Sequence, residues 1–181
     1  MVRKGIFGLV LLGAANCLAL SDSAQQETEH FALTMPDGFG RPVIARMTNG
    51  VAYAYTGSPP GVDSDSLLQI AVVSIPEWSA EARRSAVDGA LDQCLAMFMT
   101  EVARQKSGFH IDPPRNGEID SKPTRQVRWL GRYSGRQMTG ILHCARQGNR
   151  FYVIHMQDTV SAATRSFPAL KASVDTLRFM D

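Results

Sequence analysis

The alternation of apolar and polar residues predicts that the fold begins with strands. Phe31, Leu33 and Met35 alternate with polar or small residues in the first predicted segment. The fourth segment is a largely apolar run without alternation, which is typical of a central strand covered on both faces. Asn49 and Gly50 separate the second strand from the third, and this dipeptide favours a two-residue hairpin turn in which both central residues have positive φ. The four segments are 31–35, 43–47, 51–55 and 67–75.

A long amphipathic helix is predicted next, from about Ala80 to Gln105. Apolar residues recur there at helical spacing, Ser79 can cap the N-terminus, and Gly108 ends the segment. A polar loop and a short strand near Glu118 follow. The apolar stripe of the helix consists of Val87, Leu91, Cys94, Leu95, Phe98 and Val102.

Three further strands, at 124–133, 136–146 and 150–157, are predicted to form a meander with tight turns at 134–135 and 148–149. With two residues in each turn, the alternation of side chains divides the meander into two faces. One face, the predicted seat of the long helix, carries Val127, Trp129, Met138, Leu142, Cys144, Phe151, Val153 and His155. The other face carries Arg128, Arg132, Gln137, Thr139, His143 and Tyr152.

A second helix is predicted near the C-terminus, with Ser166 as its N-cap, Pro168 in its first turn and a short strand after it from Leu177 to Met180. Its apolar stripe consists of Phe167, Leu170, Val174 and Leu177. Strands, a long helix, a three-strand meander and a closing helix in this order predict an α+β fold. We expect a mostly antiparallel sheet flanked by a long central helix and a C-terminal helix, an α-β-α sandwich.

The N-terminus has the pattern of a signal peptide. Basic Arg3 and Lys4 precede an apolar stretch of about ten residues, which is too short to span a bilayer. Small residues favour cleavage after Ser21. We therefore expect a periplasmic or secreted protein without a transmembrane span in its mature chain. The predicted division is a signal peptide at 1–21, a short mature tail at 22–30 and a single α+β domain at 31–181.

Cys17 lies directly after the apolar stretch, where bacterial lipoproteins carry their lipid-modified cysteine. The residues before it are Ala14, Ala15 and Asn16. A lipobox usually has Leu three positions before the cysteine and Gly, Ala or Ser directly before it, so the match is poor. Removal of Cys17 with the leader is therefore favoured over a lipid anchor.

Composition and charge refine this prediction. The 181 residues are 44% hydrophobic and 20% charged, which allows one globular domain and excludes a disordered, collagen-like or multi-span membrane protein. Removal of the leader takes away Arg3 and Lys4, so the formal net charge falls from +2 to zero, with 17 bases and 17 acids left. The charge is segregated, because residues 121–157 hold seven bases and no acid, whereas residues 22–120 hold fourteen acids and seven bases.

The succession of elements resembles the PsbP-like and DcrB-like α-β-α sandwich family. The likeness rests on the early segment AYTGSPPGVDSDSLLQIAVVSIPEW, the long helix after it, the strand RFYVIHMQDT and the closing helix RSFPALKASVDTLRF, and covers roughly residues 30–180. Most members of the family are accessory subunits, periplasmic lipoproteins or chaperones of secreted toxins. The resemblance therefore implies a non-enzymatic binding or accessory role, and it supplies no functional residue.

Two cysteines remain after processing, Cys94 on the helix stripe and Cys144 on the sheet face assigned to that helix. In an oxidising compartment such a pair predicts a disulfide, and closing a loop of about 50 residues contributes about 4 kcal/mol. The alternative is a nucleophilic Cys144 activated by His155 on the same face, although no orienting residue or oxyanion motif accompanies it. No histidine pair has the spacing of a helix-borne zinc motif, so we predict neither a metal nor a cofactor.

The candidate binding surface is a basic strip of three arginines on the meander with two interleaved aromatic residues. Two interpretations of it stay open: ion pairing with the acidic N-terminal half of the same fold, and contact with another protein or an anionic envelope component. Arginines among aromatics are also typical of RNA binding, but export argues against nucleic acid. The residues are Arg128, Arg132, Arg136, Trp129 and Tyr133.

These patterns favour a non-enzymatic exported accessory or binding protein. Two alternatives are an immunity-type inhibitor of an envelope-directed toxin and a cysteine-dependent enzyme that uses Cys144 and His155.

Expression of the full chain in an exporting bacterium is expected to yield a mature protein that begins at Asp22 and takes up no palmitate, because cleavage after Ser21 removes Cys17. Intact-mass measurement and radiolabelled palmitate check this. Palmitate incorporation that disappears in Cys17→Ala would contradict it and indicate a lipid anchor.

Overall fold

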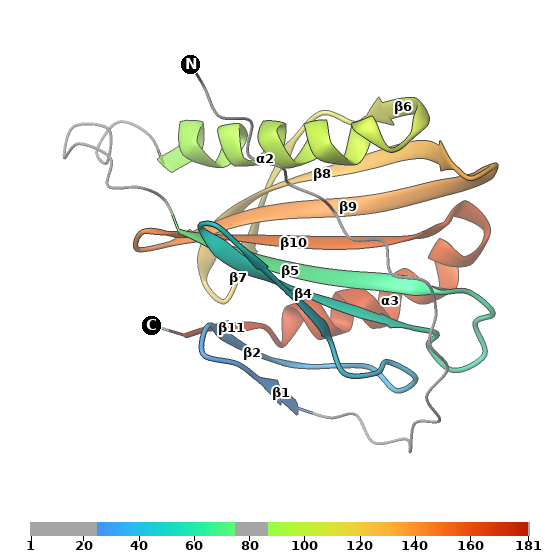
Figure 1. Cartoon of the computed structure of the whole chain (residues 1–181), viewed down its shortest axis with the longest axis horizontal. Helices are drawn as coiled ribbons and strands as arrows, with labels where there is room; N and C mark the ends of the chain where they lie inside the picture. Colours follow the sequence, from blue (N-terminus) through green and yellow to red (C-terminus); the bar gives the residue numbers. More distant parts are fainter. Residues whose placement is uncertain (1–24, 75–86, 181) are drawn as a thin grey trace.

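The computed structural model describes residues 25–74 and 87–180, and the strands in them form two antiparallel sheets (Figure 1). Their elements are β1 (Gln25–Glu27), β2 (Phe31–Thr34), β3 (Val43–Met47), β4 (Gly50–Gly57), β5 (Ser66–Ser74), α2 (Val87–Arg104), β6 (Ser107–Ile111), β7 (Arg115–Ile119), β8 (Lys122–Tyr133), β9 (Arg136–Gln147), β10 (Arg150–Thr159), α3 (Val160–Asp175) and β11 (Arg178–Phe179). The main sheet has eight strands in the order β3-β4-β5-β10-β9-β8-β6, with β7 also paired to β8. The small sheet has the order β1-β2-β11.

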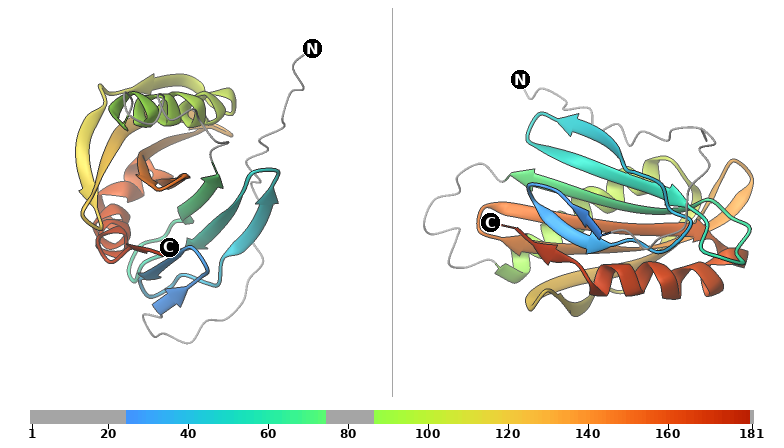
Figure 2. Two further views of the ribbon diagram at one scale, coloured as in Figure 1. Left: turned by 90° about the vertical axis from the view of Figure 1, so that its left-hand side faces the viewer. Right: turned by 90° about the horizontal axis from the view of Figure 1, so that it is seen from below.

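The two helices lie on opposite sides of the main sheet (Figures 1 and 2). Helix α2 packs on β8 and β9, whereas α3 packs on β10 and β9 from the other side. The small sheet shares the α3 side, where Phe31 and Phe179 join the same apolar core as Leu170. The predicted α+β fold with a mostly antiparallel sheet is therefore confirmed. The predicted sandwich of helical layers is confirmed only in part, because sheet dominates the molecule and supplies part of the α3-side layer.

The predicted meander and the division of its side chains are confirmed. Tyr133 pairs with Arg136 across a two-residue turn at 134–135, where both φ angles are positive, 48° and 79°. These values are typical of a type I′ turn. The apolar residues of the face assigned to the long helix pack with α2 in one core. Of the residues on that face, Val127, Trp129, Leu142, Cys144, Phe151, Val153 and His155 are buried, and Met138 is half-buried.

Trp129 crosses three strands on the α2 side. Trp129 on β8 pairs with Gly140 on β9. A Cβ atom at position 140 would lie 2.5 Å from the indole ring. Because glycine leaves this space open, the indole passes over β9, and its Nε1–H donates a hydrogen bond to Nε2 of His155 on β10, at 3.1 Å. Trp129 and His155 are 1% and 2% exposed, so this hydrogen bond satisfies two polar groups inside the core.

Asp158, at the end of β10, connects the loop before β5 to the start of α3. Its Oδ2 accepts hydrogen bonds from the hydroxyls of Ser64, Ser66 and Ser166, at 2.9, 2.7 and 2.5 Å. Its Oδ1 accepts a bond from the backbone N–H of Thr159, at 2.6 Å. Asp158 is 1% exposed. A buried carboxylate is costly unless donors replace the water that it loses, and these four hydrogen bonds do so.

The predicted N-cap of the second helix is wrong. Helix α3 follows β10 directly and begins at Val160, so Ser166 and Pro168 lie inside it. The Ser166 hydroxyl serves Asp158 instead of capping backbone N–H groups. The predicted stripe is confirmed, because Phe167, Leu170, Val174 and Leu177 are all buried, and the predicted closing strand is β11.

The hairpin between β3 and β4 is confirmed, but its predicted turn is wrong. Met47 pairs with Gly50, so the two turn residues are Thr48 and Asn49. Positive φ angles in the described chain occur at other residues, and Asn49 and Gly50 do not have them. Gly50 is needed for a different reason: a Cβ atom there would lie 2.2 Å from the Val72 carbonyl oxygen on β5.

Two further predictions differ from the structure, and two others lie partly or wholly outside the described residues. The long helix is confirmed from Val87 to Arg104, whereas Ser79 and residues 80–86 lie outside the described residues. Gly108 belongs to strand β6, which the sequence did not predict. Residues 25–27, assigned from the sequence to a short tail, form β1. The predicted leader at 1–21 also lies outside the described residues.

Cys94 of α2 and Cys144 of β9 form a disulfide, with their Cα atoms 6.3 Å apart and 50 positions apart in the chain. The predicted pairing is therefore confirmed. Both residues are buried, at 2% and 0% exposure. The bond fixes the long helix to the middle of the meander.

We expect the mature protein to resist thiol alkylation after unfolding unless it is first reduced, and then to take up two labels. Replacing both cysteines by alanine should lower the free energy of unfolding by about 4 kcal/mol at most, because the unfolded chain regains the entropy of the open loop. Alkylation followed by intact-mass measurement, together with urea unfolding, checks this. Two reactive thiols without reductant would contradict the disulfide.

His155 is expected to make folding stability depend on pH. Burial, together with the smaller effect of the Lys106 charge, lowers its pKa to about 3. The unfolded chain, with a histidine pKa near 6.5, binds this proton more readily than the folded protein. Stability is therefore highest above pH 6.5 and falls by up to about 1.4 kcal/mol per pH unit as the pH drops toward 3.

His155→Gln should reduce this slope, because glutamine can accept the bond from Trp129 but does not titrate. Urea unfolding at pH 7 and pH 5 measures the difference between the two proteins. Equal slopes would show that His155 does not contribute to the pH dependence.

Candidate functional site

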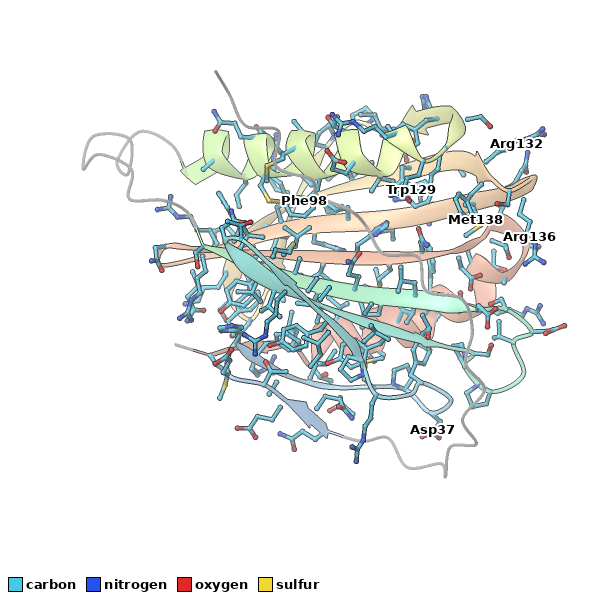
Figure 3. All side chains as sticks on the ribbon, viewed as in Figure 1. Asp37, Phe98, Trp129, Arg132, Arg136 and Met138 are labelled. Atoms are coloured by element: carbon cyan, nitrogen blue, oxygen red, sulfur yellow. A yellow bond between two sulfur atoms is a disulfide. The ribbon has the colours of Figure 1, made fainter. Side chains whose placement is uncertain are left out.

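The five residues of the predicted basic strip do not share one surface. Arg128 and Arg132 lie on the face of β8 turned away from α2, while Trp129 and Tyr133 alternate onto the α2 face. Arg136 pairs with Tyr133 and therefore belongs to the α2 face as well. Trp129 is buried in the core beneath α2 (Figure 3), so its side chain is not part of an exposed contact surface.

Arg132 and Arg136 nevertheless both lie at the end of the β8–β9 hairpin, on its two faces, and both side chains point into solvent (Figure 3). We call Arg132, Arg136 and the half-buried Tyr133 the cationic hairpin end. The two strands that carry it are paired along ten residue positions, from Thr124–Ala145 to Tyr133–Arg136. The sheet therefore fixes the backbone that presents these arginines.

Ion pairing within the fold reaches only part of the basic segment. Arg125 Nε lies 2.8 Å from Asp92 Oδ1, and its Nη1 donates to Asn116 Oδ1 at 2.6 Å. Arg128, Arg132 and Arg136 are exposed, and none of them forms an ion pair with an acid in residues 25–74 or 87–180. The two interpretations drawn from the sequence thus apply to different arginines.

Lys106 occupies the α2 side of the same region. Its Nζ lies 4.6 Å from the centre of the Trp129 ring and 5.9 Å from that of Tyr133. Burial lowers its pKa from the ordinary lysine value. Trp129 thus stacks with a cation of its own chain.

The candidate catalytic pair is fully engaged in the described structure. Cys144 is joined to Cys94, and His155 accepts the Trp129 hydrogen bond. The lowered pKa of His155 keeps its imidazole neutral over the ordinary pH range. In this disulfide-bonded state Cys144 has no thiol to act as a nucleophile.

A groove on the opposite side of the sheet was not predicted. It lies between α3, the outer face of β8 and β9, and β7, with a volume of about 860 Å³. We call it the α3 groove. Its sides are mostly apolar, including Leu130, Ile141, Met156, Val160 and Phe167. Its polar residues include Arg128, Thr139 and His143 from the predicted outer face, together with Asp112, Glu118, Thr124, Gln126, Lys171 and Asp175.

His143 lies at the polar end of the α3 groove. Its pKa is lowered to about 4, mainly by burial; the charge of Lys171 also lowers it, and that of Asp175 raises it. These two residues of α3 form an exposed ion pair, at 2.7 Å. His143 Nδ1 and Thr124 Oγ1 are buried and have no hydrogen-bond partner in the described part of the chain. The groove thus offers a neutral imidazole and a hydroxyl beside apolar side chains.

The sequence contained a partial signal for the groove. On the outer face of the meander, Leu130 and Ile141 stand among polar residues, which shows that this face is not simply solvated. What the pattern lacked was the position of α3, which decides which of these residues are covered.

The described residues contain neither a candidate metal site nor a candidate membrane-spanning helix. No group of three or more histidine, cysteine or acidic side chains in them is placed to hold a metal ion. No helix in residues 25–74 and 87–180 is both long and apolar enough to cross a membrane.

Comparison with known proteins identifies relatives by fold. No family model matches the chain, and a search of curated proteins finds no match. Cyanobacterial PsbP (CyanoP) from Synechocystis sp. PCC 6803 is similar with a TM-score of 0.52 and 8% identity, over 91% of this chain and 98% of that one. PA94, a protein of unknown function from Pseudomonas aeruginosa, is similar with a TM-score of 0.53 and 11% identity, over 76% and 96%. The chain therefore has a PsbP-like fold.

Proposed function

We propose that the protein is a non-enzymatic, exported binding or accessory protein of the cell envelope. In this proposal the cationic hairpin end contacts an acidic protein surface or an anionic envelope component. The observation that carries it is the set of exposed arginines, Arg128, Arg132 and Arg136, without ion pairs in the described chain. Unpaired cations held on one rigid hairpin attract an oppositely charged surface and orient it during association.

Export is supported by two independent features. The sequence begins with the pattern of a cleaved leader. The Cys94–Cys144 disulfide suits an oxidising compartment, because thiols in the cytosol are kept reduced.

The test compares two variants that each reverse two arginines. Arg132→Glu with Arg136→Glu removes the cationic hairpin end. Arg41→Glu with Arg46→Glu changes the net charge equally at exposed positions near and on β3, the opposite edge of the main sheet. Each cation near an anionic surface is worth about 1 kcal/mol, or about fivefold in affinity, so the hairpin variant should lose more than about fivefold of its binding.

Binding is measured in two assays: capture of partners from an envelope extract of the producing cells, and co-sedimentation with phosphatidylglycerol vesicles. The proposal expects binding in one of the two assays. This binding should weaken as salt is added, because salt screens exposed charges, and the hairpin variant alone should lose it. Equal loss in both variants, or undiminished binding of the hairpin variant in both assays, would remove the hairpin end from the function.

A further inference from the structure

The α3 groove exists because α3 covers only part of the sheet face on which it lies. The helix has 16 residues, so it is about 24 Å long and about 10 Å across with its side chains. It packs mainly on β10 and β9 and leaves exposed the part of the outer face of β8 that carries Arg128 and Leu130. The resulting volume of about 860 Å³ lies within the range of about 300–1,000 Å³ that is ordinary for small-molecule sites.

One end of the α3 groove is apolar and partly open to solvent. Leu130 of β8 and Val160 of α3 are 44% and 39% exposed, although both are large apolar side chains. Ile141 and Met156, which are register partners on β9 and β10, continue the apolar surface inward. Exposed apolar side chains lining a concave surface are typical of a site that takes an apolar ligand.

Opposite charges lie next to each other beside this apolar end. The backbone N–H of Asp112 donates to the Arg128 carbonyl at 2.9 Å, so the two residues are neighbours. Both side chains line the groove, yet they form no ion pair with each other within 4 Å. Asp112 Oδ1 lies 3.9 Å from His110, a contact that is ionic only when that histidine is protonated. A positive and a negative group are thus presented side by side.

The polar end adds hydrogen-bonding groups without adding net charge. Gln126 pairs in register with His143, one step along the groove from Arg128 and Ile141. Lys171 and Asp175 neutralise each other on α3, and the buried His143 Nδ1 and Thr124 Oγ1 have no partner in the described chain. Glu118 of β7 pairs with Pro123, so its side chain belongs to the sheet face opposite to that of Thr124 and Gln126.

We propose that the α3 groove binds a single-chain amphiphile with a zwitterionic head, of the lysophospholipid class. The chain lies along Leu130, Val160 and Phe167. The anionic group of the head pairs with Arg128, and its cationic group lies toward Asp112. A head with both signs matches both unpaired charges, whereas a purely anionic or cationic head meets repulsion from one of them. This site is separate from the cationic hairpin end and shares only Arg128 with the basic strip.

The probe is dodecylphosphocholine, kept below its critical micelle concentration and titrated into the purified protein by calorimetry. Dodecanoate and dodecyltrimethylammonium carry the same chain with a single charge. Saturable binding of dodecylphosphocholine that is tighter than that of either single-charge amphiphile is expected. No binding of dodecylphosphocholine, or binding no tighter than that of dodecanoate or of dodecyltrimethylammonium, would overturn the proposal.

Two variants and two matched controls locate the binding. Arg128→Gln should weaken it about tenfold, since it removes a hydrogen bond to a charged group. Arg46→Gln makes the same charge change at an exposed position of β3, at the opposite edge of the sheet, and should leave the binding unchanged. Thr164→Trp places a large side chain at an exposed position lining the groove and should abolish binding, whereas Ala172→Trp, exposed on the same helix outside the lining, should not. Full binding by Thr164→Trp, or equal losses in a variant and its control, would overturn the assignment of the ligand to this groove.

Discussion

The width of the main sheet is the constraint on which the rest of the structure depends. Its eight strands occupy seven positions, because β6 and β7 pair with successive parts of the same edge of β8. At about 4.8 Å per spacing these positions extend over about 29 Å, whereas one helix covers about 10 Å. On one side of the sheet α2 packs on β8 and β9, and on the other side α3 and the small sheet cover part of the surface. The outer face of β8 is covered only in part, which is why Arg128 and Leu130 stay exposed and the α3 groove forms.

The two sides of the sheet are held by different interactions. On the α2 side, the disulfide joins helix to sheet, and the indole of Trp129 reaches over Gly140 to His155. On the α3 side, one buried carboxylate, Asp158, gathers hydroxyls from the loop before β5 and from the helix itself. The first side is therefore closed and apolar. The second is anchored at one end of α3 and leaves room beside the helix, so both binding proposals concern surfaces outside the α2 core.

Local patterns predicted those features that depend on side-chain alternation. In the meander, tight turns and a period of two placed Cys144 and His155 on the α2 face and His143 on the other, which the register confirms. Predictions failed where a distant partner decided the outcome. Asn49–Gly50 is not the turn, because Gly50 is required where the backbone approaches Val72. Ser166 is not the cap, because its hydroxyl binds Asp158, eight residues earlier in the chain.

The sequence by itself determined the class of fold, the faces of the meander and the pairing of Cys94 with Cys144, because periodicity and helix stripes are local properties that survive in any compact arrangement. Only the tertiary structure decided which arginines remain unpaired and where a ligand can enter. Asp92 reaches Arg125 but not Arg128, Arg132 or Arg136, and Trp129 is buried although arginines surround it in sequence. These outcomes depend on where α2 and α3 dock across strands far apart in the chain, which no local spacing encodes.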